Sequence, residues 1–390
     1  MRKLICTLSV AITFAGCKTP PPPPEPEPPT VQLPQGLKNP VSIAVIAPLS
    51  GPYARMGASE RNGVALAVRL ANQRGGLFNA DVGMVVDDGA CSELQGKAKA
   101  KWAISVEEVR FIIGEICAES TVSASDLADE EGAVMISPVS TEPRVTLRSG
   151  GDVKPFVFRT AMMPGLQGRI AASFAWGTLD KRSAAVIFNR DSAYSRELAG
   201  AFVSRFTELG GKIAARQDYT AEQVDFTDSL KVIGASGADV LYIPDEPRFV
   251  NRIAALAKKL EVTAAFIGGD RWESGGLALA EVEGAYFTTQ FTALDERPIV
   301  REWVEEYGRT YGSPPDAAAC LSFDAALVLL SAIQAAGTSD PALVRDVLEK
   351  GAWNAVTGPI SFDGEHNPVK PGAVMQVKKG KVVFAGSAEP

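Results

Sequence analysis

The sequence predicts an α/β fold in which parallel strands, buried on both faces, alternate with amphipathic helices. Short and almost continuously apolar runs recur from residue 41 onward, and such runs are typical of parallel strands covered by helices on both sides. Segments with apolar residues at helical spacing lie between them. The chain has 390 residues, of which 46% are hydrophobic, and this length favours two lobes over one.

Eight apolar runs are the predicted strands. They span residues 41–47, 82–86, 109–114, 133–137, 184–188, 239–243, 264–268 and 285–289. Together with the C-terminal region, these strands exceed what one compact sheet usually holds, so we expect two sheets in two lobes.

Helices are predicted where apolar residues repeat at positions i, i+3, i+4 and i+7. This spacing occurs over residues 64–71, 250–257 and 300–307. Pro247 precedes the second of these segments, and proline is favoured in the first turn of a helix. The repeated order of strand and helix indicates the α/β class.

The N-terminus has the pattern of a lipoprotein export signal. Arg2 and Lys3 precede an apolar stretch over residues 4–15, which is too short to span a bilayer as a helix. The stretch ends in small residues before Cys17, so we expect residues 1–16 to be removed and Cys17 to be lipidated. The alternative is an ordinary signal peptide that is cleaved nearby.

Residues 17–40 form the predicted tether between the lipid and the folded body. Ten of the 22 residues from 19 to 40 are proline, which excludes a regular helix or strand and favours an extended spacer. A recognition motif for a proline-binding module is the alternative. Export of the anchored chain predicts a location in the periplasm, or on the outer face of the cell membrane in a Gram-positive bacterium.

The charge balance argues against nucleic acid as a partner. The net charge is −7, the isoelectric point is about 5.1, and no long basic run occurs.

The chain has five cysteines, of which two belong to the export signal. Cys6 leaves with the signal peptide, and Cys17 takes the lipid. Cys91 and Cys117 each follow a predicted strand, and we expect these two strands to be neighbours in a parallel sheet. Export places both cysteines in an oxidising compartment, where disulfides form. This placement predicts a disulfide, and two buried free thiols are the alternative.

Sequence motifs for catalysis, metals and cofactors are not found. The segment PLSGPYARMG after the first strand lacks the GxGxxG fingerprint, and no GxSxG elbow occurs. The one histidine, His366, lies in a turn-like segment, and Cys320 lies in an apolar one where we expect it to be buried. We therefore expect a binding protein without metal or cofactor rather than an enzyme.

The segment IAVIAPLSGPYARMGASERNGVALAV resembles the opening of the leucine/isoleucine/valine-binding protein family. Further matches follow in the family's order: NQRGGL, DDGAC, IIGEICAEST, SASDLADEEGAVMISPVSTEP, FRTAM, DFTDSL and VTGPISFDGEHN. The resemblance covers nearly all of residues 41–390, and its specificity lies in the joint order and spacing. It also implies a disulfide between Cys91 and Cys117, as in that family.

The resemblance implies the type I periplasmic-binding fold, in which two Rossmann-like lobes are joined by three crossovers and enclose a ligand cleft. We expect lobe one to contain residues 41–160 and 286–355, and lobe two to contain residues 161–285 and 356–390. The implied function is that of a solute-binding lipoprotein of an ABC transporter. It would bind an amino acid, by default a branched-chain aliphatic one, and deliver it to an ABC permease in the inner membrane. We expect the protein to be a monomer.

Ligands of open α/β sheets bind beyond the carboxyl ends of the strands. The resemblance places eight ligand-binding candidates in loops at such ends: Met56, Ile116, Ala118, Ser140, Thr141, Tyr194, Glu246 and Asp270. Asp270 lies where the family carries an acidic residue for the ligand ammonium. The helix that begins near Ala118 offers free N–H groups to the α-carboxylate.

Each candidate also has a purely structural interpretation. Ser140 and Thr141 can cap the following turn, Asp270 can be a helix N-cap, Tyr194 can be a packing residue of lobe two, and Met56 can fill core or surface.

Some candidates depart from the family pattern. Ala118 replaces a serine, Met56 and Ala318 stand where aromatic residues narrow the pocket, and Glu246 lies near a tyrosine position. These departures predict a pocket that is wider and more acidic than one for leucine.

Two other functions remain open on the same fold. One is a sensor or binder of amides or of aromatic or small carboxylates. The other is an outer-membrane lipoprotein that regulates cell-wall synthesis, since Lys18 after the lipidated cysteine permits outer-membrane sorting.

Overall fold

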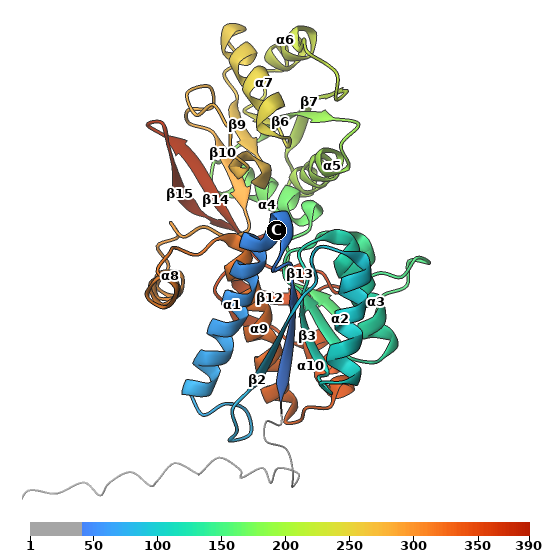
Figure 1. Ribbon diagram of the computed structural model, residues 1–390. Helices are drawn as coiled ribbons and strands as arrows, with labels where there is room; N and C mark the ends of the chain where they lie inside the picture. Colours follow the sequence, from blue (N-terminus) through green and yellow to red (C-terminus); the bar gives the residue numbers. More distant parts are fainter. Residues whose placement is uncertain (1–40) are drawn as a thin grey trace, which may run out of the picture.

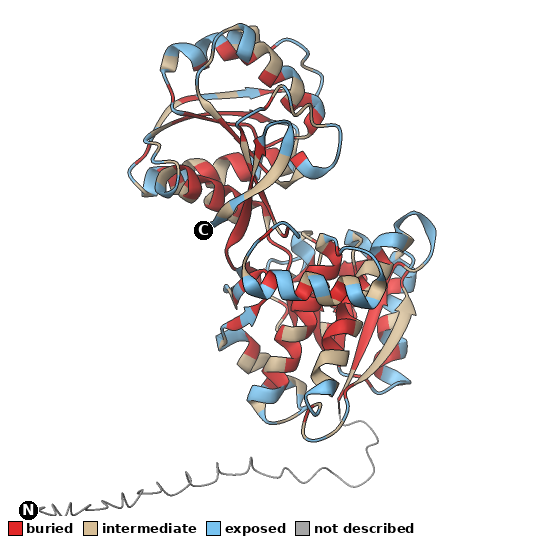
Figure 2. Ribbon diagram, turned by 90° about the vertical axis from the view of Figure 1, so that its left-hand side faces the viewer, coloured by how far each residue is buried: buried red, intermediate tan, exposed pale blue. Residues whose placement is uncertain are grey.

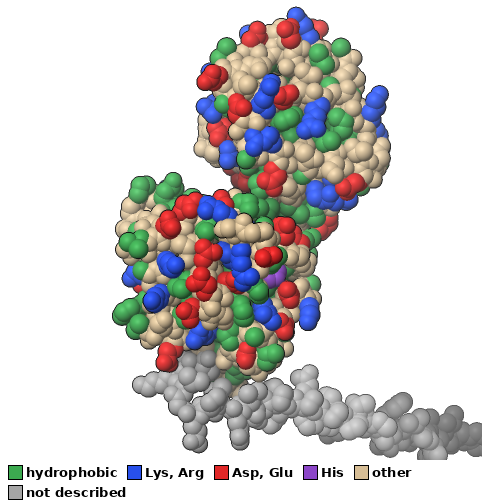
Figure 3. Space-filling model, turned by 90° about the vertical axis from the view of Figure 1, so that its right-hand side faces the viewer, with side chains coloured by type: hydrophobic (Ala, Val, Ile, Leu, Met, Phe, Trp, Pro, Cys, Tyr) green, Lys and Arg blue, Asp and Glu red, His purple; other side chains and the backbone are tan. Residues whose placement is uncertain are grey.

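A computed structural model describes residues 41–390, which form two α/β lobes joined at a narrow waist (Figure 1). The predicted signal peptide, Cys17 and the proline-rich tether lie outside the described residues. Buried residues concentrate in the strands and the inward helix faces of both lobes (Figure 2). On the face shown in Figure 3, acidic and basic side chains are intermixed without a broad basic patch.

Lobe one is built on a parallel five-stranded sheet in the order β2-β1-β3-β4-β5. Its strands are β1 (Ser42–Ala47), β2 (Gly83–Asp88), β3 (Phe111–Gly114), β4 (Val134–Ser137) and β5 (Val157–Arg159). Alternate residues of β1 enter two different cores, because successive side chains of a strand point to opposite faces. Ile43 and Val45 pack toward one core, and Ala44 and Ile46 toward the other.

Helices cover both faces of this sheet. One face packs against α1 (Ala54–Gln73), α8 (Pro298–Tyr311), α9 (Ala317–Ala336) and α10 (Pro341–Lys350). The other packs against α2 (Glu93–Ser105) and α3 (Ala118–Glu130). Short 3₁₀ helices η1 (Gly51–Tyr53) and η2 (Pro143–Val145) lie in loops after strands, and a small antiparallel sheet comprises β11 (Trp353–Ala355), β12 (Gly358–Phe362) and β13 (Pro368–Val369).

Helix α9 is the one helix among the described residues that is long and apolar enough to cross a membrane by length and composition. Its 18-residue apolar window is 78% buried inside the protein. The core of lobe one therefore accounts for the apolar sequence of this helix.

Lobe two is built on a seven-stranded sheet in the order β15-β14-β10-β9-β8-β6-β7. The parallel strands are β6 (Ser183–Asn189), β7 (Lys212–Tyr219), β8 (Val240–Tyr242), β9 (Ala265–Gly268) and β10 (Tyr286–Thr289). The hairpin of β14 (Gly372–Lys378) and β15 (Lys381–Ala388) adds to β10 in antiparallel pairing. The helices of this lobe are α4 (Pro164–Gly177), α5 (Ala193–Glu208), α6 (Thr227–Ser236), α7 (Pro247–Lys259) and the 3₁₀ helix η3 (Asp270–Glu273).

Three chain crossovers join the lobes, after β5, after β10 and after β13. The expected return to lobe one at residue 286 is wrong, because β10 pairs with β9 and β14 in the lobe-two sheet. The expected departure at residue 356 is also wrong, because Val356 and Ile360 belong to the lobe-one core. The first boundary therefore lies a few residues later, near Gln290, and the second lies about fifteen residues later, near Pro371.

The predicted α/β class and type I periplasmic-binding fold are confirmed. All eight apolar runs contain observed strands, and the three helical segments lie within α1, α7 and α8. Pro247 is the first residue of α7, as predicted.

Candidate ligand-binding cleft

A cleft of about 440 Å³ lies where the two lobes meet. Lobe one contributes residues from the loop after β4, and lobe two contributes residues from α4, α5 and η3. The lining residues are Val139, Thr141, Pro164, Gln167, Tyr194, Asp270, Arg271, Glu273, Ser274 and Gln290. Three of the predicted site residues, Thr141, Tyr194 and Asp270, are among them.

Asp270 is held in the lobe-two wall by two neutral donors. Strand β9 ends at Gly268, and Asp270 begins η3 just beyond the carboxyl end of the sheet. The Tyr194 hydroxyl donates to one carboxylate oxygen at 2.7 Å, and the Gln167 amide donates to the other at 2.9 Å. Each oxygen keeps lone-pair capacity for a further donor from a ligand.

Tyr194 is positioned by its place in α5 and by a glycine beside it. The Ser192 side chain caps this helix, which sets Tyr194 in its first turn. A Cβ atom at position 269 would lie 2.5 Å from the Tyr194 hydroxyl oxygen, so only glycine permits this approach. Burial, with a smaller contribution from the Asp270 charge, raises the pKa of Tyr194 well above its usual value. The phenol is therefore protonated and donates to Asp270.

The buried guanidinium of Arg159 holds the loop after β4, which forms the lobe-one side of the cleft. Arg159 is fully buried and donates to the Ser140 carbonyl at 3.3 Å and to the Thr146 hydroxyl at 2.9 Å. Burial lowers the pKa of Arg159 to about 10, so the group is still charged at neutral pH. Ser140 is buried while Thr141 lines the cleft, so only Thr141 of this predicted pair is part of the cleft surface.

Glu246 lies beside the cleft and forms an ion pair with Arg271, which lines it. The Arg271 guanidinium lies 4.1 Å from the centre of the Tyr194 ring and 3.0 Å from a Glu246 carboxylate oxygen. The other Glu246 oxygen lies 3.3 Å from the Arg248 guanidinium. Glu246 therefore compensates two arginines, and it does not line the cleft itself.

Besides Ser140 and Glu246, three further predicted candidates do not line the cleft in this structure. Met56 is 39% exposed in the first turn of α1, Ile116 is half-buried, and Ala118 is exposed as the first residue of α3. They lie at the carboxyl-end edge of the lobe-one sheet, but the cleft is formed on this side by Val139 and Thr141.

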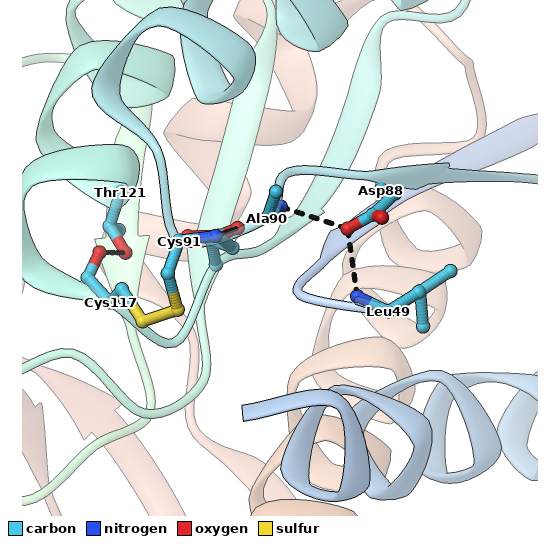
Figure 4. The surroundings of a disulfide bond; sticks show 7 residues. Leu49, Asp88, Ala90, Cys91, Cys117 and Thr121 are labelled. Atoms are coloured by element: carbon cyan, nitrogen blue, oxygen red, sulfur yellow. Dashed lines mark hydrogen bonds between the residues drawn. A yellow bond between two sulfur atoms is a disulfide. The ribbon is translucent and has the colours of Figure 1, made fainter. Parts of the chain in front are cut away.

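The disulfide between Cys91 and Cys117 is confirmed (Figure 4). It joins the loop after β2 to the start of α3, with the two Cα atoms 5.2 Å apart. The expectation that the two preceding strands are neighbours is wrong, because β1 lies between β2 and β3 in the sheet. Beside it, Asp88 accepts hydrogen bonds from the backbone N–H groups of Leu49 and Ala90, each at 2.9 Å. Cys320 is free and buried, as predicted.

Sequence reasoning missed five polar residues of the cleft: Gln167, Arg271, Glu273, Ser274 and Gln290. Gln290 lies on the second crossover and accepts a hydrogen bond from the Met162 backbone N–H on the first, at 2.8 Å. Glu273 accepts a hydrogen bond from the Thr289 hydroxyl at 2.6 Å. The segment DRWE carried the one available signal, a second carboxylate three residues after Asp270.

The electrostatics of Glu273 reflect its position inside a concave surface. Its side chain is exposed to water, but the protein that forms the cleft still displaces part of its hydration. This partial desolvation, together with the nearby Asp270 charge, raises the pKa of Glu273 to about 7.

The arrangement suits binding of a small polar solute with a positive group. The lining has two carboxylates, two amides, hydroxyls and the Arg271 guanidinium, which is paired with Glu246, and no histidine or cysteine is among the described lining residues. The one described cluster of potential metal ligands, Cys91, Glu115 and Cys117, contains the disulfide, so its sulfurs are not thiolates.

Comparisons with known proteins identify the family of this chain. The sequence profile of the family described as periplasmic binding protein matches residues 40–381. The chain is 26% identical to the leucine-, isoleucine-, valine-, threonine- and alanine-binding protein of Pseudomonas aeruginosa over 83% of this chain and 86% of that protein. It is 28% identical to Leu/Ile/Val-binding protein homolog 1 of Brucella suis, over 86% and 89% respectively.

Among solved structures, the chain is similar to the leucine-binding protein LivK from Thermotoga maritima. The sequences are 30% identical, and the match covers 90% of this chain and 99% of that one with a TM-score of 0.62.

Proposed function

The chain belongs to the periplasmic binding protein family, and from this premise we propose that it is an extracytoplasmic solute-binding lipoprotein of an ABC transporter. Its ligand is an α-amino acid, held between the lobes. The observation that carries the proposal is Asp270, which faces the interlobe cleft while neutral donors from Tyr194 and Gln167 hold its two oxygens.

The chemistry of the cleft supports an α-amino acid. The Asp270 carboxylate is suited to the ligand ammonium, and a charge-assisted pair in a closed cleft is strong. Lobe one offers the Thr141 hydroxyl inside the cleft. The first N–H groups of α3 lie outside the cleft in this structure, and they would suit the α-carboxylate when the lobes close. The similar proteins named above are described as binding leucine, isoleucine and valine, so branched-chain amino acids are the reference ligands.

Delivery to a membrane permease is the second part of the proposal. Lipidation of Cys17 and the proline-rich residues 19–40 would hold the lobes near an inner-membrane permease while leaving them free to open and close. The chain would act as a monomer, by binding and release rather than by catalysis.

A thermal-shift screen of the purified chain against the common amino acids, simple carboxylates and amides tests this function. We expect an α-amino acid to raise the melting temperature, because a ligand that binds only the folded state stabilises it. Stabilisation by simple carboxylates or amides alone would contradict the proposal, and calorimetry of the best ligand would give its affinity.

A further inference from the structure

Two carboxylates of the cleft lie on one side of the same short helix. Asp270 and Glu273 are the first and last residues of the 3₁₀ helix η3, and both line the cleft. Residues three apart are eclipsed in a 3₁₀ helix, so these side chains stand one above the other. The resulting repulsion favours a ligand that brings positive charge to both.

Neither carboxylate forms an ion pair within the described part of the chain. Asp270 is held by a hydroxyl and an amide, and Glu273 by the Thr289 hydroxyl at 2.6 Å. Arg271 lies between them in sequence but is turned toward the Tyr194 ring and Glu246. Asp270 and Glu273 therefore have no cationic partner in the protein, and a cationic ligand group beside Glu273 would favour the charged form of this carboxyl, whose pKa is about 7 without ligand.

The other lining residues offer little to an aliphatic side chain. Seven of the ten are polar or charged, and the apolar surface comes from Val139, Pro164 and the Tyr194 ring. Burial of an aliphatic chain yields about 25 cal/mol per Å² only where apolar surface is removed from water. A cationic side chain instead meets a carboxylate that has no other cation.

We infer that the cleft selects an α-amino acid with a positively charged side chain, whose α-ammonium pairs with Asp270 and whose side-chain cation pairs with Glu273. This inference rests on the proposed amino-acid-binding function and names the side-chain class of its ligand. Glu273 is then the residue that determines specificity, and Asp270 is the residue that holds the amino group common to all amino acids.

Calorimetry of the full chain, purified in detergent, with L-lysine and L-norleucine tests the inference. The two ligands share a four-carbon side chain, and lysine adds the terminal ammonium. We expect lysine to bind at least about tenfold more tightly than norleucine, the gain of one charge-assisted pair.

Glu273→Gln removes the charge but keeps an oxygen that can accept the Thr289 hydrogen bond. It should bring the lysine affinity down to within about threefold of the norleucine affinity, which should itself change little, because the variant lacks only the second pair. Glu222→Gln is the matched control, since Glu222 is exposed in lobe two and does not line the cleft. It should leave both affinities unchanged.

The possible outcomes separate the two proposals. If norleucine or leucine binds as tightly as lysine, the inference is wrong while the amino-acid function stands. If lysine is preferred but Glu273→Gln leaves that preference intact, Glu273 is not the determinant and the inference is equally overturned. If no amino acid binds the wild-type chain, both the function and the inference fail. The comparison of two ligands on the wild-type chain needs no variant to fold.

Discussion

At the residue scale, Asp270 carries the proposed recognition of the ligand's amino group. Asp270→Asn keeps the size of the side chain and removes its charge, which leaves a ligand ammonium without an anionic partner. We expect a loss of about 2–5 kcal/mol in binding free energy, which is roughly 30-fold to several thousand-fold in affinity. Calorimetry with the best amino acid from the screen measures this loss.

Tyr194→Phe is the companion variant. It removes the 2.7 Å hydrogen bond to Asp270 but leaves the carboxylate charged, so the cost should be smaller, about 0.5–1.5 kcal/mol. An unchanged affinity in Asp270→Asn would remove Asp270 from the site.

A second residue-scale prediction concerns two carboxyls buried in lobe one. Glu60 of α1 is fully buried, and neither carboxyl oxygen has a hydrogen-bond partner among the described residues. Burial, and then the charge of Glu115, raises the pKa of Glu60 well above its usual value. Burial likewise raises the pKa of Glu115.

A raised folded-state pKa means that the native state holds protons that the unfolded state has lost. The free energy of unfolding therefore falls as the pH rises from the unfolded pKa through the folded one. Glu60→Gln stays neutral, so it should match the wild type near pH 4 and exceed it at pH 8 by about 1–3 kcal/mol. Denaturant unfolding at both pH values measures the difference, and equal pH dependence in the two proteins would refute the interpretation.

Particular residues show how far the sequence predicts the site. Thr141, Tyr194 and Asp270 follow the carboxyl ends of strands, and strand ends are visible as the ends of apolar runs. Gln167 reaches Asp270 from α4 through the packing within lobe two. Gln290 lies on a crossover, whose approach to the cleft depends on the angle between the lobes. No local pattern encodes that angle, and the same holds for the distance of Met56 from the cleft.

At the scale of elements, the disulfide ties the start of α3 to the loop after β2. It closes a loop with a sequence separation of 26, which predicts a stabilisation of about 3 kcal/mol. We expect the paired substitution of Cys91 and Cys117 by serine to lower the free energy of unfolding by about this amount. Peptide mapping without reductant should show these cysteines linked and Cys320 free, whereas a stability unchanged in the double variant would contradict the argument.

The sequence predicts those strands whose residues are almost all buried and therefore apolar. The central strands are buried on both faces and read as continuous apolar runs. Strand β7 (Lys212–Tyr219) was not predicted, because it lies at the edge of its sheet and carries exposed polar residues in KIAARQDY. Strand β5 is only three residues long, and the hairpin of β14 and β15 depends on pairing with the distant β10.

At the scale of the whole molecule, the lipid anchor and the binding lobes are proposed to act independently. Cys17→Ser removes the lipidation site, which lies outside the described residues. We expect the variant to leave the membrane fraction while its ligand affinity stays within about twofold of wild type, a difference below 0.5 kcal/mol. Fractionation followed by calorimetry tests both parts, and a variant that still sediments with membranes would show that the lipidation prediction is wrong.

The three crossovers allow the lobes to move as two bodies, and the cleft takes residues from both. A ligand that contacts both lobes favours the closed arrangement, and it shifts that equilibrium only by its differential affinity for the two states. Ligand binding in the cleft should therefore make the whole molecule more compact.

Small-angle X-ray scattering with and without the best amino acid tests the central claim most directly. The account predicts that saturating ligand lowers the radius of gyration of the wild-type chain, and that the same ligand concentration leaves Asp270→Asn unchanged. An identical radius of gyration for the free and the fully saturated wild-type chain would contradict binding between closing lobes.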